Sequence, residues 1–262
     1  VIGNEDIDAM PTINGDIYGG GKYDRVGNVE IQLVKFATVP TVYGGSDVNG
    51  ITNVTNIYLR NMTVGTIYGG LKTNGTVTTS NVYLQSGTVT DVYGGGYGGV
   101  TTTSNVNLEG TATVSSIYGG SNTSGNVRTS NVKLKSGTTL NVYGGGNSAS
   151  VETANVNLDG ITIDSVHGGS KTAGVTTNTN VALNSGTVTN VYGAGYGVGA
   201  TNAKVTQKGA NVTNIYGGNE GGYGDSSETT NATVNIESAV VENVYGGNLG
   251  RGTTRNATIN VT

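Results

Sequence analysis

The chain has 262 residues, of which 46 are glycine and none is cysteine or tryptophan, and its formal net charge at pH 7 is −4. A collagen chain would combine this much glycine with a Gly-X-Y period and abundant proline, and the sequence has neither. The absence of cysteine excludes disulfides and thiolate metal sites. The mild acidity disfavours a nucleic-acid partner. No apolar run approaches the roughly 18 residues of a membrane span, so none is predicted.

Residues 1–12 precede the first repeat and are predicted to form an N-terminal arm, followed by one repeat domain over residues 13–262. The arm is acidic and does not read as a signal peptide. Carboxylates cluster in this region at Glu5, Asp6, Asp8 and Asp16. They could bind a cation weakly, but a solvated arm is the simpler interpretation.

A tetrapeptide signal, Ile/Val-Tyr-Gly-Gly, recurs about every 25 residues from the N-terminal region to the end of the chain. One member has histidine in place of tyrosine, and Tyr192 is followed by Gly-Ala. A fixed period of this length is typical of stacked repeat architectures. The ten aromatic positions are Tyr18, Tyr43, Tyr68, Tyr93, Tyr118, Tyr143, His167, Tyr192, Tyr216 and Tyr245.

A second signal lies in each repeat: an asparagine, a small or β-branched apolar residue, any residue, and then Leu, Ile or Val. The alternation has the period of two that a half-buried β-strand shows. We expect the ten asparagines to form one column of stacked side chains, or to bond the backbone of a corner. They are Asn28, Asn56, Asn81, Asn105, Asn131, Asn155, Asn180, Asn202, Asn231 and Asn256.

A third segment, such as Gly87 to Gly95, leads to each tyrosine. Val89 and Val92 are three residues apart, which breaks strict alternation and suggests a corner or bulge between two short strands. Three strands and three corners per repeat predict an all-β fold, a single-stranded β-solenoid (β-helix) of about ten coils with roughly 25 residues per coil. A β-propeller is the main rival, but its blades need roughly 40 to 50 residues.

The aromatic positions are expected to point outward or into a corner and to stack on one another. A sharper hypothesis makes them, or tyrosines in the glycine-rich loops, a surface for sugar rings. The loop tyrosines are the better candidates for glycan contact, although loop packing explains them as well: Tyr97, Tyr196 and Tyr223.

Residues for catalysis are scarce. His167 is the only histidine and occupies a tyrosine slot, so no Ser-His-Asp arrangement is evident. The acidic residues are scattered, and no stretch repeats the aspartate that a calcium roll requires in every turn. We therefore expect a protein that is not an enzyme and that uses no cofactor and no metal.

The tandem Ile/Val-Tyr-Gly-Gly with intervening Thr-x-Asn-Val-x-Leu resembles the glycine-rich repeats of bacterial and archaeal surface proteins of the adhesin-like or filament-like kind. The resemblance spans residues 13–262. It implies a β-solenoid at the cell surface or outside the cell, acting as a stalk, adhesin or fibre subunit. His167 and the long step from Tyr216 to Tyr245 depart from the pattern.

The chain ends at Thr262, just after the strand that follows the final asparagine. Residues 13–17 of a second molecule could complete the arc to another tyrosine. An uncapped strand edge invites pairing, and soluble solenoids normally carry caps. We therefore expect an extracellular structural protein that stacks head to tail into a filament or layer, with residues 1–12 reaching across the junction. The alternative is an adhesin that binds cell-surface glycans.

Overall fold

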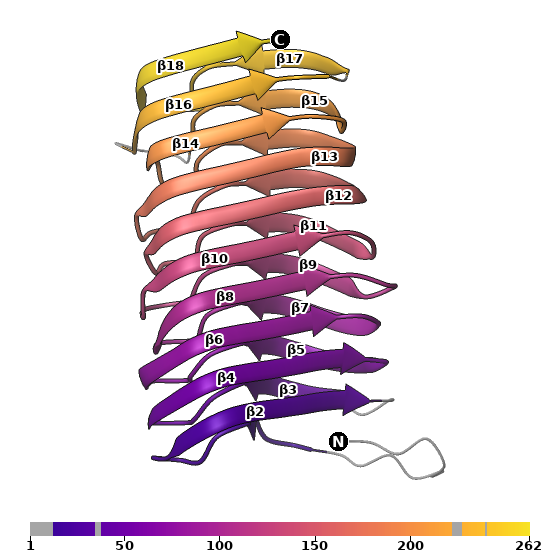
Figure 1. Ribbon diagram of the computed structural model, residues 1–262, viewed down its shortest axis with the longest axis vertical. Helices are drawn as coiled ribbons and strands as arrows, with labels where there is room; N and C mark the ends of the chain where they lie inside the picture. The colour runs from indigo at the N-terminus through magenta and orange to yellow at the C-terminus, as the bar shows by residue number, and fades with distance from the viewer. Residues whose placement is uncertain (1–12, 35–37, 222–226, 239) are drawn as a thin grey trace.

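The computed structural model describes residues 13–34, 38–221, 227–238 and 240–262, which wind into a stack of coils (Figure 1). Each strand pairs in parallel with the strand one coil away, as Val82 does with Val106, and the described residues contain no helix. The predicted all-β solenoid is confirmed. Its ten aromatic positions span about nine turns of roughly 25 residues.

Each coil contains two strands. The tyrosine strands end at the repeated aromatic residue, and the asparagine strands carry the asparagine signal. In two places an asparagine segment and the following tyrosine segment are joined into one long strand. The tyrosine strands are β1 (Ile17–Tyr18), β3 (Thr38–Tyr43), β5 (Met62–Tyr68), β7 (Gly87–Tyr93), β9 (Thr113–Tyr118), β11 (Thr138–Tyr143), β15 (Asn211–Tyr216) and β17 (Val241–Tyr245). The asparagine strands are β2 (Arg25–Val34), β4 (Asn49–Arg60), β6 (Asn74–Leu84), β8 (Val100–Leu108), β10 (Val127–Leu134), β14 (Ala200–Gln207), β16 (Glu228–Ile236) and β18 (Thr253–Val261). The long strands are β12 (Val151–His167) and β13 (Thr176–Tyr192).

The expectation of three strands per coil is wrong. Val89 and Val92 both lie in β7, and both are buried. The parallel pairing skips Thr90 and resumes at Asp91, so the spacing of three residues marks an irregularity within one strand. The pairing omits Ser115 of β9 as well, so both strands share this irregularity without a change of register, and both valines lie in the interior.

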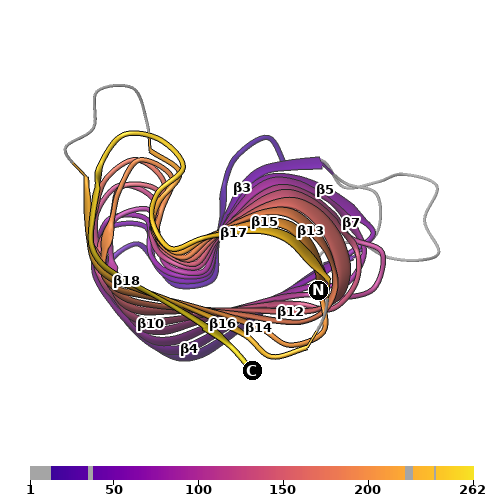
Figure 2. The same ribbon diagram turned by 90° about the horizontal axis from the view of Figure 1, so that it is seen from above.

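The core fills the space between the two kinds of strand. Seen from above, the asparagine strands form one long side of each coil, and the tyrosine strands form part of the other (Figure 2). The chain folds inward beyond the end of the tyrosine strands, which gives the coil an indented outline. Val82 and Leu84 of one kind of strand belong to the same buried cluster as Val89 and Val92 of the other. Stacking makes this cluster continuous along the rod.

The glycines after each tyrosine have a steric role. A Cβ at Gly119 would overlap the carbonyl oxygen of Gly144 in the next coil, so only glycine fits this approach. A buried hydroxyl serves the same segment, since Ser130 donates a hydrogen bond to the Gly144 carbonyl at 2.5 Å. Equivalent hydrogen bonds to a glycine carbonyl are donated by the hydroxyls of Thr55, Ser80, Ser104 and Thr179. This column of small residues fixes the corner from inside the core.

Candidate functional site: the aromatic ladder and its flanking column

The ten aromatic residues form one uninterrupted stack, here called the aromatic ladder. Successive ring centroids are 4.5–5.2 Å apart and successive planes differ by 5–17°. Such contacts contribute about 0.5–1.5 kcal/mol per pair. The predicted stacking is confirmed, and of the two expected orientations, outward or into a corner, the outward one is excluded, because the members from Tyr43 to Tyr216 are at most 8% exposed. Their rings are therefore not open to sugar.

Burial also fixes the charge state of the ladder. Desolvation raises the pKa of the hydroxyls at Tyr43, Tyr93 and Tyr143, because the phenolate form loses its hydration. These three hydroxyls are consequently neutral throughout the physiological pH range. The ladder hydroxyls serve as hydrogen-bonding groups.

The ladder is covered by a second column, here called the flanking column, which consists of the residue four positions after each ladder aromatic. Backbone bonds hold it in register, since Lys72 N donates to Ser46 O at 3.2 Å and Asn122 N to Gly96 O at 3.0 Å. The same bond recurs at each coil up to Leu249, whose N donates to Asn219 O at 3.1 Å. Flanking side chains are thereby aligned along the whole stack.

Every second member of the flanking column bonds the ladder aromatic two coils earlier in the chain. Four such contacts occur along the rod. Lys72 Nζ donates to Tyr18 OH at 2.5 Å, Asn122 Nδ2 to Tyr68 OH at 2.9 Å and Lys171 Nζ to Tyr118 OH at 3.2 Å, and Glu220 Oε2 lies 2.7 Å from His167 Nε2. The column therefore ties each coil to its second neighbour, with a two-coil period.

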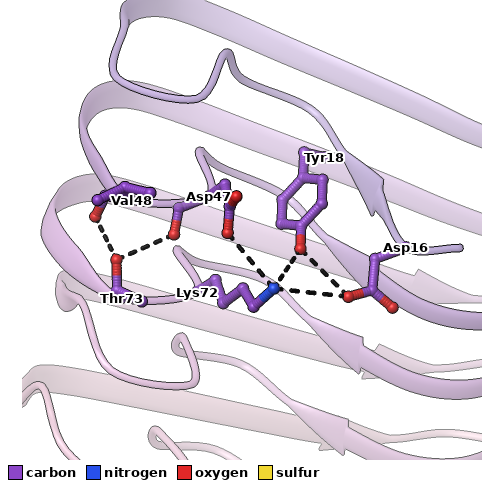
Figure 3. Close-up of polar contacts among 6 residues, drawn as sticks. All are labelled: Asp16, Tyr18, Asp47, Val48, Lys72 and Thr73. Atoms are coloured by element: carbon purple, nitrogen blue, oxygen red, sulfur yellow. Dashed lines mark hydrogen bonds and ion pairs between the residues drawn. The ribbon is translucent and has the colours of Figure 1, made fainter.

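The first of these contacts belongs to a charged network (Figure 3). Lys72 Nζ lies 3.7 Å from Asp16 Oδ2 and 3.4 Å from Asp47 Oδ1, and Tyr18 OH donates to Asp16 at 3.1 Å. The hydrogen bond to Tyr18 is the main cause of a raised pKa at Lys72. Asp16 is thus part of an internal ion-pair network. The other predicted acidic residues, Glu5, Asp6 and Asp8, lie outside the described residues.

His167 takes its place in the ladder as predicted, stacked between Tyr143 and Tyr192. The ring is almost fully buried, and desolvation lowers its pKa below the ordinary value despite the neighbouring Glu220 carboxylate. A neutral imidazole with its proton on Nε2 donates to Glu220. The ring contacts Glu220, the two neighbouring ladder rings and Tyr196.

The asparagine ladder consists of two columns. Nδ2 of each asparagine donates to Oδ1 of the asparagine one coil earlier, at 2.8–3.0 Å. The first column runs from Asn56 to Asn180 through Asn81, Asn105, Asn131 and Asn155. The second contains Asn178, Asn202, Asn231 and Asn256.

The prediction of one column with ten members is therefore wrong at Asn28, Asn202, Asn231 and Asn256. Asn28 pairs with Val54, while Glu30 is the partner of Asn56. Asn202 pairs with Asn178, while Lys204 faces Asn180. Alternation repeats every two residues along a strand, so a shift of two preserves the pattern of buried and exposed positions. The sequence signal could not distinguish the two registers.

Two of the loop tyrosines, Tyr97 and Tyr196, belong to the flanking column, each four residues after a ladder aromatic. Tyr97 and Tyr196 are 41% and 39% exposed. Each places one edge against the ladder, Tyr97 on Tyr68 at 5.8 Å and Tyr196 on His167 at 5.9 Å between centroids. Their outer surfaces face solvent, as a recognition role requires. Tyr223 lies outside the described residues.

A separate hollow of about 540 Å³ lies over the starts of β8, β10, β12 and β13. Its lining is mostly threonine and valine, with one exposed ion pair between Arg128 and Glu152 at 3.5 Å. Across the described residues, no three His, Cys, Asp or Glu side chains come together as a metal site would require.

In comparisons with known proteins, no family model, no curated protein and no solved structure matches the chain. Within the part of the chain that the structure describes, no helix is long and apolar enough to cross a membrane.

Proposed function

We propose that the protein is an extracellular, non-enzymatic structural subunit that associates head to tail into a surface filament or layer. The repeated interactions support a load-bearing rod, since backbone bonds, aromatic rings and amides all run along one axis. A rod of this construction is lengthened by any partner that offers another coil.

The observation that carries the proposal is the open face of the final coil. Tyr245, Ile259 and Val261 are 47%, 43% and 76% exposed, although Tyr216 and Val234, which pair with the first two, are buried and Ile236, which pairs with Val261, is partly buried. The edge of β18 presents unpaired backbone groups beside these apolar side chains, which is a template for another strand. Another coil of the same chain provides the matching pattern.

Electron microscopy and sedimentation of the purified protein test this proposal. We expect rods longer than one molecule, whose length increases with protein concentration. The full chain and a chain lacking residues 1–12 are compared, because these residues directly precede the first coil in the sequence. Strictly monomeric particles in both preparations would contradict the proposal.

The alternative, an adhesin that binds cell-surface glycans, is favoured by the exposed rings of Tyr97 and Tyr196. Aromatic faces are suitable platforms for sugar rings. A glycan array with the wild-type protein and with Tyr97→Ala, Tyr196→Ala and Tyr223→Ala separates the two functions. Specific binding that these substitutions abolish supports the adhesin, whereas no binding by any form removes it.

A further inference from the structure

We propose that the joint between two copies has one defined register, in which Lys22 of the upper copy donates a hydrogen bond to Tyr216 of the lower copy. This inference rests on the proposed head-to-tail function and specifies its partner surface: the first coil of a second copy of this chain placed on the last coil of the first. Four observations lead to this register.

The first observation is the two-coil period of the flanking column. Counting coils by their ladder aromatic from Tyr18 to Tyr245, odd-numbered coils bond odd-numbered coils, and the series proceeds through Tyr18, Tyr68, Tyr118 and His167. The next aromatic is Tyr216, and no described residue donates to its hydroxyl. A second copy stacked on Tyr245 supplies the eleventh coil, whose flanking residue is Lys22.

Lys22 has the chemistry that this position needs. Lysine already fills it at Lys72 and Lys171, which bond Tyr18 and Tyr118. Within one molecule Lys22 is exposed, and its ammonium lies 5.7 Å from the ring centroid of Tyr23. The even number of coils preserves the odd series across the joint. With an odd number of coils, Lys22 of the second copy would belong to the even-numbered series.

The second observation concerns the amide columns. Asn28 was displaced from the first asparagine column, and it shares the column of Val54, which leads through Asn178 and Asn202 to Asn256. The upper copy thus brings Asn28 over Asn256. By the same pairing Gln32 shares the column of Asn260. Two amide pairs continue across the joint.

The third observation is the backbone. Gly217 N donates to Tyr245 O at 2.8 Å, and Gly218 N to Gly247 O at 3.0 Å. One coil further, Gly246 N and Gly247 N point toward the place of the next coil. Tyr18 O and Gly20 O of a second copy are the corresponding acceptors. The tyrosine strand β1 then pairs with β17 as it pairs with β3 in its own molecule.

The fourth observation is the shape of the opposite end. A hollow of about 400 Å³ opens beside β1 and β2, lined by Ile17, Tyr18, Gly19 and residues 28–32. It contains the residues that the register assigns to the joint, including Tyr18 and Asn28. The exposed Ile259 lies in the column of Ile31, which also lines the hollow. Apolar and amide positions of the two ends therefore match.

Cysteine pairs on exposed strand positions test the register directly, because the chain has no cysteine of its own. Directly paired residues on neighbouring strands allow the Cα distance of a disulfide. Mixing Asn28→Cys with Asn256→Cys, or Gln32→Cys with Asn260→Cys, should give oxidised dimers. The crossed mixtures, Asn28→Cys with Asn260→Cys and Gln32→Cys with Asn256→Cys, are displaced by four residues, about 13 Å along the strand, and should form no disulfide between copies.

Hydroxyl removal provides a matched second test. Tyr216→Phe keeps the ring and removes the acceptor for Lys22, whereas Tyr192→Phe makes the same change in an even coil, where the flanking residue two coils on is Leu249. We expect Tyr216→Phe to weaken association about tenfold in sedimentation, as loss of a charged hydrogen bond does, and Tyr192→Phe to leave it unchanged. Lys22→Glu should weaken it at least as much, with Lys133→Glu as the charge-matched control.

The outcomes separate this inference from the proposed function. Wild-type protein that stays monomeric overturns both. Wild-type assembly with equal cross-linking of direct and crossed pairs, or with equal effects of Tyr216→Phe and Tyr192→Phe, overturns the register and leaves head-to-tail association standing. Cross-links confined to the direct pairs, together with the selective effect of Tyr216→Phe, support the register.

Discussion

The two ends of the rod differ in how much apolar surface they leave open. In the first coil Val29, Ile31 and Leu33 are at most 6% exposed, and Ile13 and Ile17 pack against the same core. In the last coil Ile259 and Val261 are largely exposed, and so is Tyr245. The sequence motifs at the two ends are alike. The burial of an apolar side chain is therefore decided by what covers its coil, and hardly at all by residues of the same coil. Within the described residues, a position is buried only where other residues cover it on both sides: Ile13 and Ile17 pack against the core at the first coil, whereas β18 of the last coil pairs on one side with β16.

The largest effect should come from core truncation in the middle of the rod. Leu158 is fully buried, and Val261 occupies the same column at the open end. Leu158→Ala should lower the free energy of unfolding by about 2–5 kcal/mol, because it leaves a cavity. Val261→Ala should change the monomer by less than about 0.5 kcal/mol but weaken association. Urea unfolding followed by circular dichroism measures both, and equal losses would contradict the comparison.

A glycine pair should give the next largest difference. A Cβ at Gly145 would lie 2.6 Å from the backbone nitrogen of Ser170, whereas one at Gly247 would meet Thr254 Oγ1 at an ordinary 3.5 Å. Gly145→Ala should destabilise the protein by about 1–3 kcal/mol through overlap with the next coil. Gly247→Ala should be close to neutral in the monomer. Thermal unfolding of dilute samples distinguishes these results, and a neutral Gly145→Ala would refute the steric argument.

The single histidine gives the rod a pH dependence. Because burial lowers the folded-state pKa of His167 below 6.5, the unfolded chain binds the proton more readily. The histidine contribution is complete above that pH and is lost as the pH falls below about 6.5, at up to about 1.4 kcal/mol per pH unit. His167→Tyr should flatten this dependence. Unfolding midpoints between pH 7.5 and pH 5.5 provide the measurement, and an unchanged slope in the variant would assign the effect elsewhere.

The smallest of the four effects concerns the amide columns. Asn131 bonds the asparagine on either side of it, whereas Asn256 bonds only Asn231 within the described chain. Asn131→Ala should cost about 1 kcal/mol, and Asn256→Ala about half as much in the monomer. Assembly should make the two losses similar, because the joint supplies the missing neighbour. Chemical unfolding below and above the association concentration tests this convergence.

The repeat length and the stacking of tyrosines could be predicted from the sequence because the Tyr-Gly-Gly signal is tied to a backbone approach that only glycine allows, as at Gly119. The register of the asparagines could not be predicted, because a shift by two residues, as at Asn202, leaves the alternation of buried and exposed side chains unchanged. The burial of the ladder could not be predicted from the sequence either. Its cover comes from residues such as Asn122, more than fifty positions from the hydroxyl it bonds.

The flanking column did leave a signal in the sequence. Lys72, Asn122, Lys171 and Glu220 all stand four residues after an aromatic in alternate repeats. Their partners lie two coils away, whereas the repeat in the sequence has the length of one coil. The loop in which they lie also varies in length, so it resembled a connection without a fixed partner.

A cryo-EM reconstruction of the assembled protein tests the central claim most directly. The account predicts a continuous fibre in which ten coils at about 4.8 Å give an axial subunit repeat on the order of 48 Å. In that fibre Tyr18 of one subunit stacks on Tyr245 of the next, and Lys22 reaches Tyr216. Isolated rods at high protein concentration, or a fibre whose subunits contact side by side with the end faces apart, would contradict it.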